Sequence, residues 1–212
     1  MKKQRRKSNL GFDFAKWSSS LLMLAVFRPK VHYPFGKPDK KGKLIVSSNH
    51  IGALDCVKIA FAFPWRRMWT LTRSQCFKTP FSNWVFRSIN CIPVDRDNVS
   101  TDTYREILDV LKEEKMVLIF SEGRLNFEGN NLLDYKMGTA FFAAMSGAPV
   151  IPVFIVRREN HWLRTHIIVG QKLWIKDICE GVPSMPDIQK FNEYIKEKEG
   201  ELEKWKDEHM GK

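Results

Sequence analysis

From Lys43 onward, short apolar runs alternate with stretches of helical character, and this alternation constrains the fold more than any other feature of the sequence. A strand with one solvent-exposed face alternates polar and apolar residues, and these runs do not. We therefore expect strands that are covered on both faces. Strands separated by helices are typical of an α/β fold with a mostly parallel central sheet covered by helices. The predicted strands are residues 44–46, 68–72, 91–94, 116–120, 150–156 and 167–175.

Helical stretches separate these strands. The predicted helices cover residues 54–63, 101–113 and 135–145, and a longer one begins near Ser184. Ser184 and Asp187 have the spacing of a capping box, which marks the start of this last helix. Because the sequence shows no internal repeat and no linker, residues 37–212 are predicted to form one domain.

Residues 1–36 form a basic, amphipathic extension. Residues 2–7 contain five basic residues and no acid, within a chain of net charge +11. In residues 12–27, apolar side chains from Phe14 to Leu24 recur at the spacing of one helical face. Such a segment is typical of a helix that contacts a membrane surface with anionic lipids, and the alternative is a helix packed on the protein's own core. The longest apolar run here has seven residues, fewer than the roughly 20 that span a bilayer.

Composition narrows the classes of function. The sequence is 43% hydrophobic with 12 Gly and 10 Pro, which excludes collagen-like and disordered chains. Four dispersed cysteines lack zinc-site spacing, so we predict reduced core residues, no metal and a cytosolic compartment. No zinc-finger, RNP-type or bZIP pattern accompanies the positive charge, so nucleic acid is not an expected partner.

Polar clusters follow three of the predicted strands, where an open α/β sheet binds its ligands. In the first cluster, the carboxylate of Asp55 can fold back to accept the Nδ1 proton of His50, which leaves Nε2 as an outward-facing general base. Gly52 suits the tight turn that this requires. Alternatively, Asp55 could favour the positive end of its helix, and His50 could be a hydrogen-bonded surface residue.

The other two clusters supply positive charge. Arg96 and Arg124 both follow apolar strands, and Arg73 follows the second predicted strand. Guanidinium groups converging from these positions would bind a phosphate or a carboxylate, although each arginine alone could be a solvated surface residue. Glu122 is expected to hold Arg124 in position, and Gly123 to let a substrate approach its backbone N–H. Together with His50, these residues predict a site for an anionic substrate that loses a proton.

At these positions the sequence resembles the glycerolipid acyltransferase family. The family's blocks are a histidine, four residues and an aspartate; an Asp-Arg pair after an apolar strand; Phe-Pro-Glu-Gly-Thr-Arg; and an apolar strand that contains proline. The matching segments here are residues 49–55, 92–96, 120–124 and 150–153. The third block departs from the family, because Ser121 replaces the proline and the threonine before Arg124 is missing.

The resemblance implies an O-acyltransferase that converts lysophosphatidic acid to phosphatidic acid without a cofactor. His50, oriented by Asp55, would deprotonate the acceptor hydroxyl, which attacks the thioester of acyl-CoA or an acyl-carrier protein. The residues implied at the acceptor phosphate are Arg73, Arg96, Glu122, Gly123 and Arg124. The alternatives are a catalytically inactive lipid- or membrane-binding module and an acyltransferase for another lipid acceptor. Because the acceptor is a lipid, we expect a peripheral, monotopic protein on the cytoplasmic face of the membrane.

Overall fold

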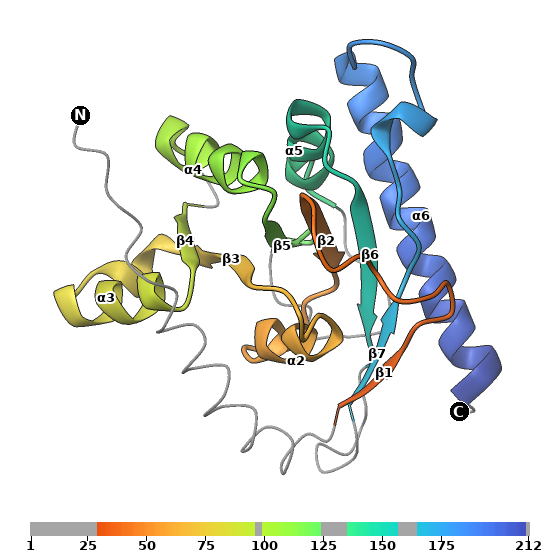
Figure 1. Cartoon of the computed structure of the whole chain (residues 1–212), viewed down its shortest axis with the longest axis horizontal. Helices are drawn as coiled ribbons and strands as arrows, with labels where there is room; N and C mark the ends of the chain where they lie inside the picture. The colour runs from red at the N-terminus through yellow and green to blue at the C-terminus, as the bar shows by residue number, and fades with distance from the viewer. Residues whose placement is uncertain (1–28, 96–98, 124–134, 157–164, 211–212) are drawn as a thin grey trace.

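A seven-stranded sheet forms the centre of the protein. A computed structural model describes residues 29–95, 99–123, 135–156 and 165–210. The strands are β1 (Lys30–His32), β2 (Leu44–Ser48), β3 (Met68–Arg73), β4 (Cys91–Val94), β5 (Met116–Phe120), β6 (Val150–Ile155) and β7 (His166–Val169). Their order across the sheet is β1-β7-β6-β2-β5-β3-β4 (Figure 1). The strands from β6 to β4 are parallel, β7 is antiparallel to β6, and β1 is parallel to β7. The expectation of a mostly parallel sheet is confirmed.

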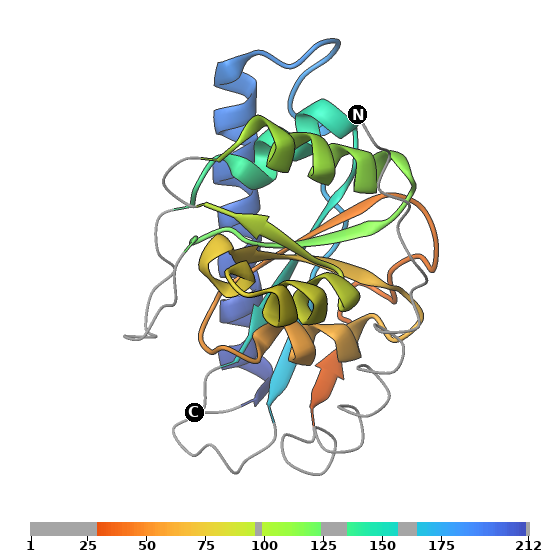
Figure 2. The ribbon, with the colours of Figure 1, turned by 90° about the vertical axis from the view of Figure 1, so that its left-hand side faces the viewer.

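Helices cover both faces of this sheet. They are α2 (Asp55–Ala62), α3 (Pro80–Ser88), α4 (Thr101–Lys112), α5 (Gly138–Ser146) and α6 (Met185–Met210), with two short 3₁₀ helices, η1 (Ser74–Phe77) and η2 (Ile175–Asp177). In β2, Ile45 belongs to a core shared with α4, α5 and α6, whereas Leu44 and Val46 belong to a second core under α2. Figure 2 shows α4 on one side of the sheet and α2 on the other. Burial on both faces explains why β5 and β6 are apolar throughout.

Most predicted elements differ from the structure by one or two residues at an end, and two differ by three or more. The strand predicted over residues 167–175 ends at Val169, because Gly170 turns close against Pro152 and donates its N–H to the Pro152 carbonyl. Leu173 nevertheless forms an isolated antiparallel bridge with Val150 of β6, and both Leu173 and Ile175 are buried, so their apolar character reflects burial beyond the end of β7. The helix predicted over residues 135–145 begins only at Gly138, because residues 135 and 136 extend along the turn that follows β5.

The sequence pattern missed β1 and α3. None of the three residues of β1 is fully buried, and none of the nine residues of α3 is, although Phe81, Trp84 and Val85 recur at helical spacing. The start of α3 was nevertheless signalled by Thr79, which caps the helix in a reciprocal capping box with Ser82, and by proline at the first helical position.

The cysteines are only partly a core feature. All four are free thiols, as predicted, but only Cys91 is buried, and the other three are half-buried. The predicted helix over residues 12–27 lies outside the described residues. Within the described ranges, no helix combines the length and the apolar character needed to span a bilayer.

Candidate active site

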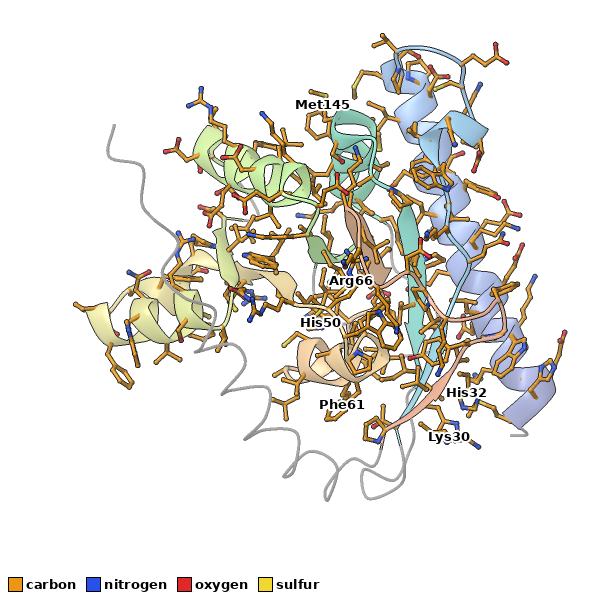
Figure 3. All side chains as sticks on the ribbon, viewed as in Figure 1. Lys30, His32, His50, Phe61, Arg66 and Met145 are labelled. Atoms are coloured by element: carbon orange, nitrogen blue, oxygen red, sulfur yellow. The ribbon has the colours of Figure 1, made fainter. Side chains whose placement is uncertain are left out.

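The carboxyl ends of β2, β3 and β5 meet at one edge of the sheet, because these strands are parallel. His50 follows β2 at this edge, next to α2 (Figure 3). Its ring stacks on Phe120, the last residue of β5, with ring centroids 3.9 Å apart and an interplanar angle of 13°. The side chain of His50 is 12% exposed, so most of the ring is held by the protein and a small part is accessible.

Asp55, the first residue of α2, fixes the orientation of His50. Its Oδ2 atom lies 3.1 Å from Nδ1 of His50 and accepts hydrogen bonds from the backbone N–H groups of Ile51 and Gly52, each at 2.7 Å. A carboxylate only accepts hydrogen bonds, so Nδ1 is the protonated ring nitrogen and Nε2 carries the lone pair. The residues at positions 50 to 55 therefore orient His50 by local contacts alone, and they leave an Nε2 lone pair of the kind that a general base needs.

The protein stabilises the ionised form of Asp55, although the side chain is buried. Its side chain is fully buried, and burial alone would raise its pKa. The hydrogen bond from His50, the Lys58 ammonium and the N–H of Gly52 outweigh burial and lower the pKa below its ordinary value. Lys58 lies 3.1 Å from Oδ1, one helical turn after Asp55. Sequence reasoning missed Lys58, although three-residue spacing on a helix allows such an ion pair.

Asn49 fixes the point at which the chain leaves β2. Its side-chain amide donates to the carbonyl of Ile155 at 3.0 Å and accepts from the N–H of Ile155 at 2.8 Å. The side chain thus continues the pairing of β2 with β6 past the end of the strand. This contact holds the backbone next to His50 in register with the sheet.

The turn after β5 brings Glu122 and Gly123 to the same edge. Glu122 is 3% exposed. Gly123 has a φ of +65°, which favours glycine, whereas the only close neighbour of a Cβ atom there is the flexible side chain of Lys136 at 2.9 Å. We expected the N–H of Gly123 to be open to a substrate, but it donates to the Phe120 carbonyl at 3.0 Å.

Of the three arginines expected to converge, the structure describes one. Arg73 is the last residue of β3 and is exposed at the carboxyl edge of the sheet. Arg96 and Arg124 lie outside the described residues, so their convergence stays a prediction. Within the described part of the chain, no three His, Cys, Asp or Glu side chains gather as metal ligands would.

The Acyltransferase family model matches residues 28–156, which is more than half of the chain. The chain belongs to this family. It is 27% identical over 161 residues to a 1-acyl-sn-glycerol-3-phosphate acyltransferase of Borreliella burgdorferi, a match covering 74% of this chain and 62% of the relative. It is 31% identical over 121 residues to an N-acylphosphatidylethanolamine synthase of Arabidopsis thaliana, covering 53% of this chain and 42% of the relative. The chain therefore spans less than two thirds of either protein.

Other acyltransferases match over more of their length. A 1-acyl-sn-glycerol-3-phosphate acyltransferase of Bacillus subtilis is 22% identical over 179 residues, covering 82% of this chain and 87% of the relative. The crystal structure of the acyltransferase PlsC from Thermotoga maritima superposes with a TM-score of 0.67 at 19% identity, covering 97% of this chain and 84% of that one. This likeness shows that the two proteins share a fold.

Behind the family's third block lies a buried polar network that the sequence did not predict. Ser121, which replaces the family's proline, has its hydroxyl 2.8 Å from the hydroxyls of both Ser47 and Thr139. Ser47 also donates to Oε2 of Glu199 at 3.4 Å, which links the turn to α6. Glu199 lies beyond the matched residues, and the apolar stripe of its helix indicated packing alone.

Glu199 is fully buried among these groups. Burial raises its pKa to about 8, and the nearby charge of Glu122 acts in the same direction, against hydrogen bonds that include the one from Ser47. Burial also raises the pKa of Tyr135, and the carboxylate of Glu199 adds to that rise. Two carboxyl groups thus lie in one buried region behind the turn, and Glu199 holds a proton at neutral pH.

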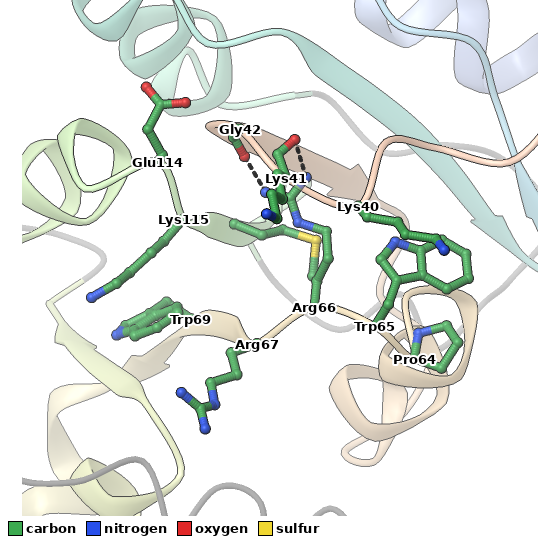
Figure 4. A pocket seen from close by; sticks show the side chains of 11 residues that line it. Lys40, Lys41, Gly42, Pro64, Trp65, Arg66, Arg67, Trp69, Glu114 and Lys115 are labelled. Atoms are coloured by element: carbon green, nitrogen blue, oxygen red, sulfur yellow. Dashed lines mark hydrogen bonds between the residues drawn. The ribbon is translucent and has the colours of Figure 1, made fainter.

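The opposite edge of the sheet carries a basic pocket that is separate from this site. Its volume is about 630 Å³, and Figure 4 shows lysine and arginine side chains together with Trp65 and Trp69 around it. Arg66 in its wall donates to the carbonyls of Asp39 and Gly42 and so anchors the loop before β2. We assign this arginine a structural role.

Proposed function

We propose that this protein is an O-acyltransferase that moves a fatty acyl group from a thioester donor to the hydroxyl of lysophosphatidic acid, forming phosphatidic acid. The observation that carries the proposal is the contact of His50 Nδ1 with the buried carboxylate of Asp55 at the carboxyl edge of the sheet. Two of the relatives described above are named 1-acyl-sn-glycerol-3-phosphate acyltransferases, which supports this choice of acceptor.

The proposed reaction needs only one proton carrier. Nε2 of His50 removes the proton of the acceptor hydroxyl as the oxygen attacks the thioester carbonyl. The new C–O bond forms, the C–S bond breaks, and the departing sulfur takes the proton from the imidazolium. Asp55 stabilises that imidazolium while it exists, and positioned proton transfer of this kind contributes about 10² to 10⁴ in rate.

The remaining roles follow from the charge of the substrates. Arg73, Arg96 and Arg124 would hold the acceptor phosphate, supported by Glu122 and Gly123. The donor is acyl-CoA or an acyl-carrier protein, and no cofactor takes part. Since the acceptor resides in a membrane, the protein would act peripherally on the cytoplasmic face, with residues 1–27 in contact with anionic lipids.

The test is product formation by the full chain and by a His50→Ala variant. We expect the unmodified protein to convert lysophosphatidic acid to phosphatidic acid, detected by mass spectrometry, and the variant to lose this activity while it still binds lipid. His209→Ala is the matched control, because His209 is an exposed histidine near the end of α6. Failure of the unmodified protein to acylate any lysolipid would favour an inactive lipid-binding module.

The same assay separates the candidate acceptors. Phosphatidylethanolamine belongs in the panel, because the Arabidopsis relative is named N-acylphosphatidylethanolamine synthase. An amide product would identify an amine acceptor, whereas an ester product would identify a hydroxyl. Running each acceptor with acyl-CoA and with acyl-carrier protein identifies the donor at the same time.

A further inference from the structure

The outer face of α3 carries two large aromatic side chains that are mostly exposed. Phe81 is 73% exposed and Trp84 is 67% exposed, and their ring centroids lie 6.2 Å apart on one side of the helix. Rings of this size usually bury most of their area, so two of them on one exposed face indicate an interaction surface.

The helix is firmly held despite this exposure. Its start is fixed by the capping box between Thr79 and Ser82. Phe86 contacts Phe77 of η1 with centroids 5.4 Å apart, and Arg87 pairs with Glu106 of α4 at 2.5 Å. The outward aromatic rings are therefore presented by a fixed element.

The segment that contains η1 and α3 carries charges of one sign. Residues 73–90 contain three basic residues and no acid. Arg87 is paired with Glu106, while Arg73 and Lys78 are exposed just before the helix. Tryptophan and phenylalanine flanked by basic side chains are characteristic of surfaces that lie in the interfacial region of an anionic bilayer.

The position of α3 relates this surface to the site. η1 and α3 follow the carboxyl end of β3, so the helix begins at the same edge of the sheet as His50. α3 also lies on the same side of the sheet as α2, the helix that carries Asp55 (Figures 1 and 2). A bilayer resting on α3 would therefore lie beside the edge at which His50 is accessible.

We propose that Phe81 and Trp84 insert into the interfacial region of an anionic membrane and position the site over its lipid acceptor. This inference rests on the proposed function, because it assumes that the acceptor is drawn from that membrane. The charge of residues 73–90 favours an anionic bilayer over a second copy of this basic chain, whose own α3 would bring like charge against it.

The test compares vesicle binding of the full chain with that of a Phe81→Ser/Trp84→Ser double variant. The vesicles contain phosphatidylcholine with phosphatidylglycerol, and binding is measured by co-sedimentation. Transfer of two aromatic rings out of the interface should weaken binding by about tenfold or more. The matched control is Val182→Ser/Met185→Ser, which removes two apolar side chains that are 95% and 63% exposed near the start of α6 and should bind like the unmodified protein.

Activity assays separate this inference from the proposed function. With acceptor embedded in vesicles, the α3 variant should lose activity by the same factor as binding, and with a short-chain acceptor dissolved as monomers it should remain fully active. Equal vesicle binding by the variant and the unmodified protein would overturn the inference. So would a dimer, detected by analytical ultracentrifugation, that the double variant dissociates. If the unmodified protein acylates neither acceptor, the proposed function fails, and the binding comparison still decides whether α3 contacts membranes.

Discussion

Replacing Glu199 by glutamine should change how the stability of the protein depends on pH. Glu199 is fully buried behind the turn that carries Glu122, and its pKa is raised from an ordinary value of 4.5 to about 8. Between these two values the folded protein keeps a proton on Glu199 that the unfolded chain releases. The free energy of unfolding therefore falls as pH rises through this interval.

The size of the effect follows from the shift. Each pH unit within the interval removes about 1.4 kcal/mol, so the change between about pH 5.5 and about pH 7.5 is roughly 3 kcal/mol. Glutamine is neutral at every pH and resembles the protonated acid in size, so Glu199→Gln should lose this contribution. The stability of the variant relative to the unmodified protein should rise by roughly 3 kcal/mol over the same two pH units.

Urea denaturation of both proteins at several pH values measures this difference. The contributions of groups that titrate in both proteins cancel when one free energy of unfolding is subtracted from the other. Glu197→Gln is the matched control, since Glu197 lies on the same helix but is exposed, and the variant makes the same change of side chain. Its stability should run parallel to that of the unmodified protein. If the curves of Glu199→Gln and the unmodified protein are also parallel, Glu199 is charged in the folded state and the account of the network is wrong.

Two further substitutions test the contacts around His50. Asp55→Asn should lower turnover by about 10² to 10⁴, because an amide neither stabilises the imidazolium of His50 nor keeps the hydrogen on its Nδ1 atom. Steady-state kinetics would show this loss in kcat. An unchanged kcat would mean that Asp55 only caps its helix. Asn49→Ala should lower the free energy of unfolding by about 1 to 3 kcal/mol, because the buried N–H and carbonyl of Ile155 lose their partners. Denaturation against an Asn83→Ala control, at an exposed position on α3, measures that cost.

Sequence reasoning worked where the determining contacts are local. His50 and Asp55 are five positions apart, and the backbone groups that hold the carboxylate lie between them, so a short motif contains the whole arrangement. The strand at residues 116–120 was placed correctly because burial on both faces makes it uniformly apolar, and residues 91–94 were placed correctly although only Cys91 and Ile92 of that edge strand are buried. The same signal extended β7 too far, since Leu173 and Ile175 are buried without belonging to a strand.

The features that the sequence did not predict depend on contacts between distant segments. Ser47 and Glu199 are separated by 152 positions, and nothing in the charged pattern of α6 distinguishes Glu199 from the exposed acids beside it. α3 was missed although its signals are local: Phe81, Trp84 and Val85 recur at helical spacing behind a capping box, but none of them is buried.

The end of β5 connects the two halves of the site. Consecutive residues of a strand point to opposite faces of the sheet, and here Phe120 stacks on His50 while Ser121 bonds to Ser47 and Thr139 on the other face. A shift of Ser121 within its network would therefore move the ring on which His50 rests. At the position where the family's third block has proline, the hydroxyl of Ser121 thus anchors the turn from behind through hydrogen bonds to two other segments.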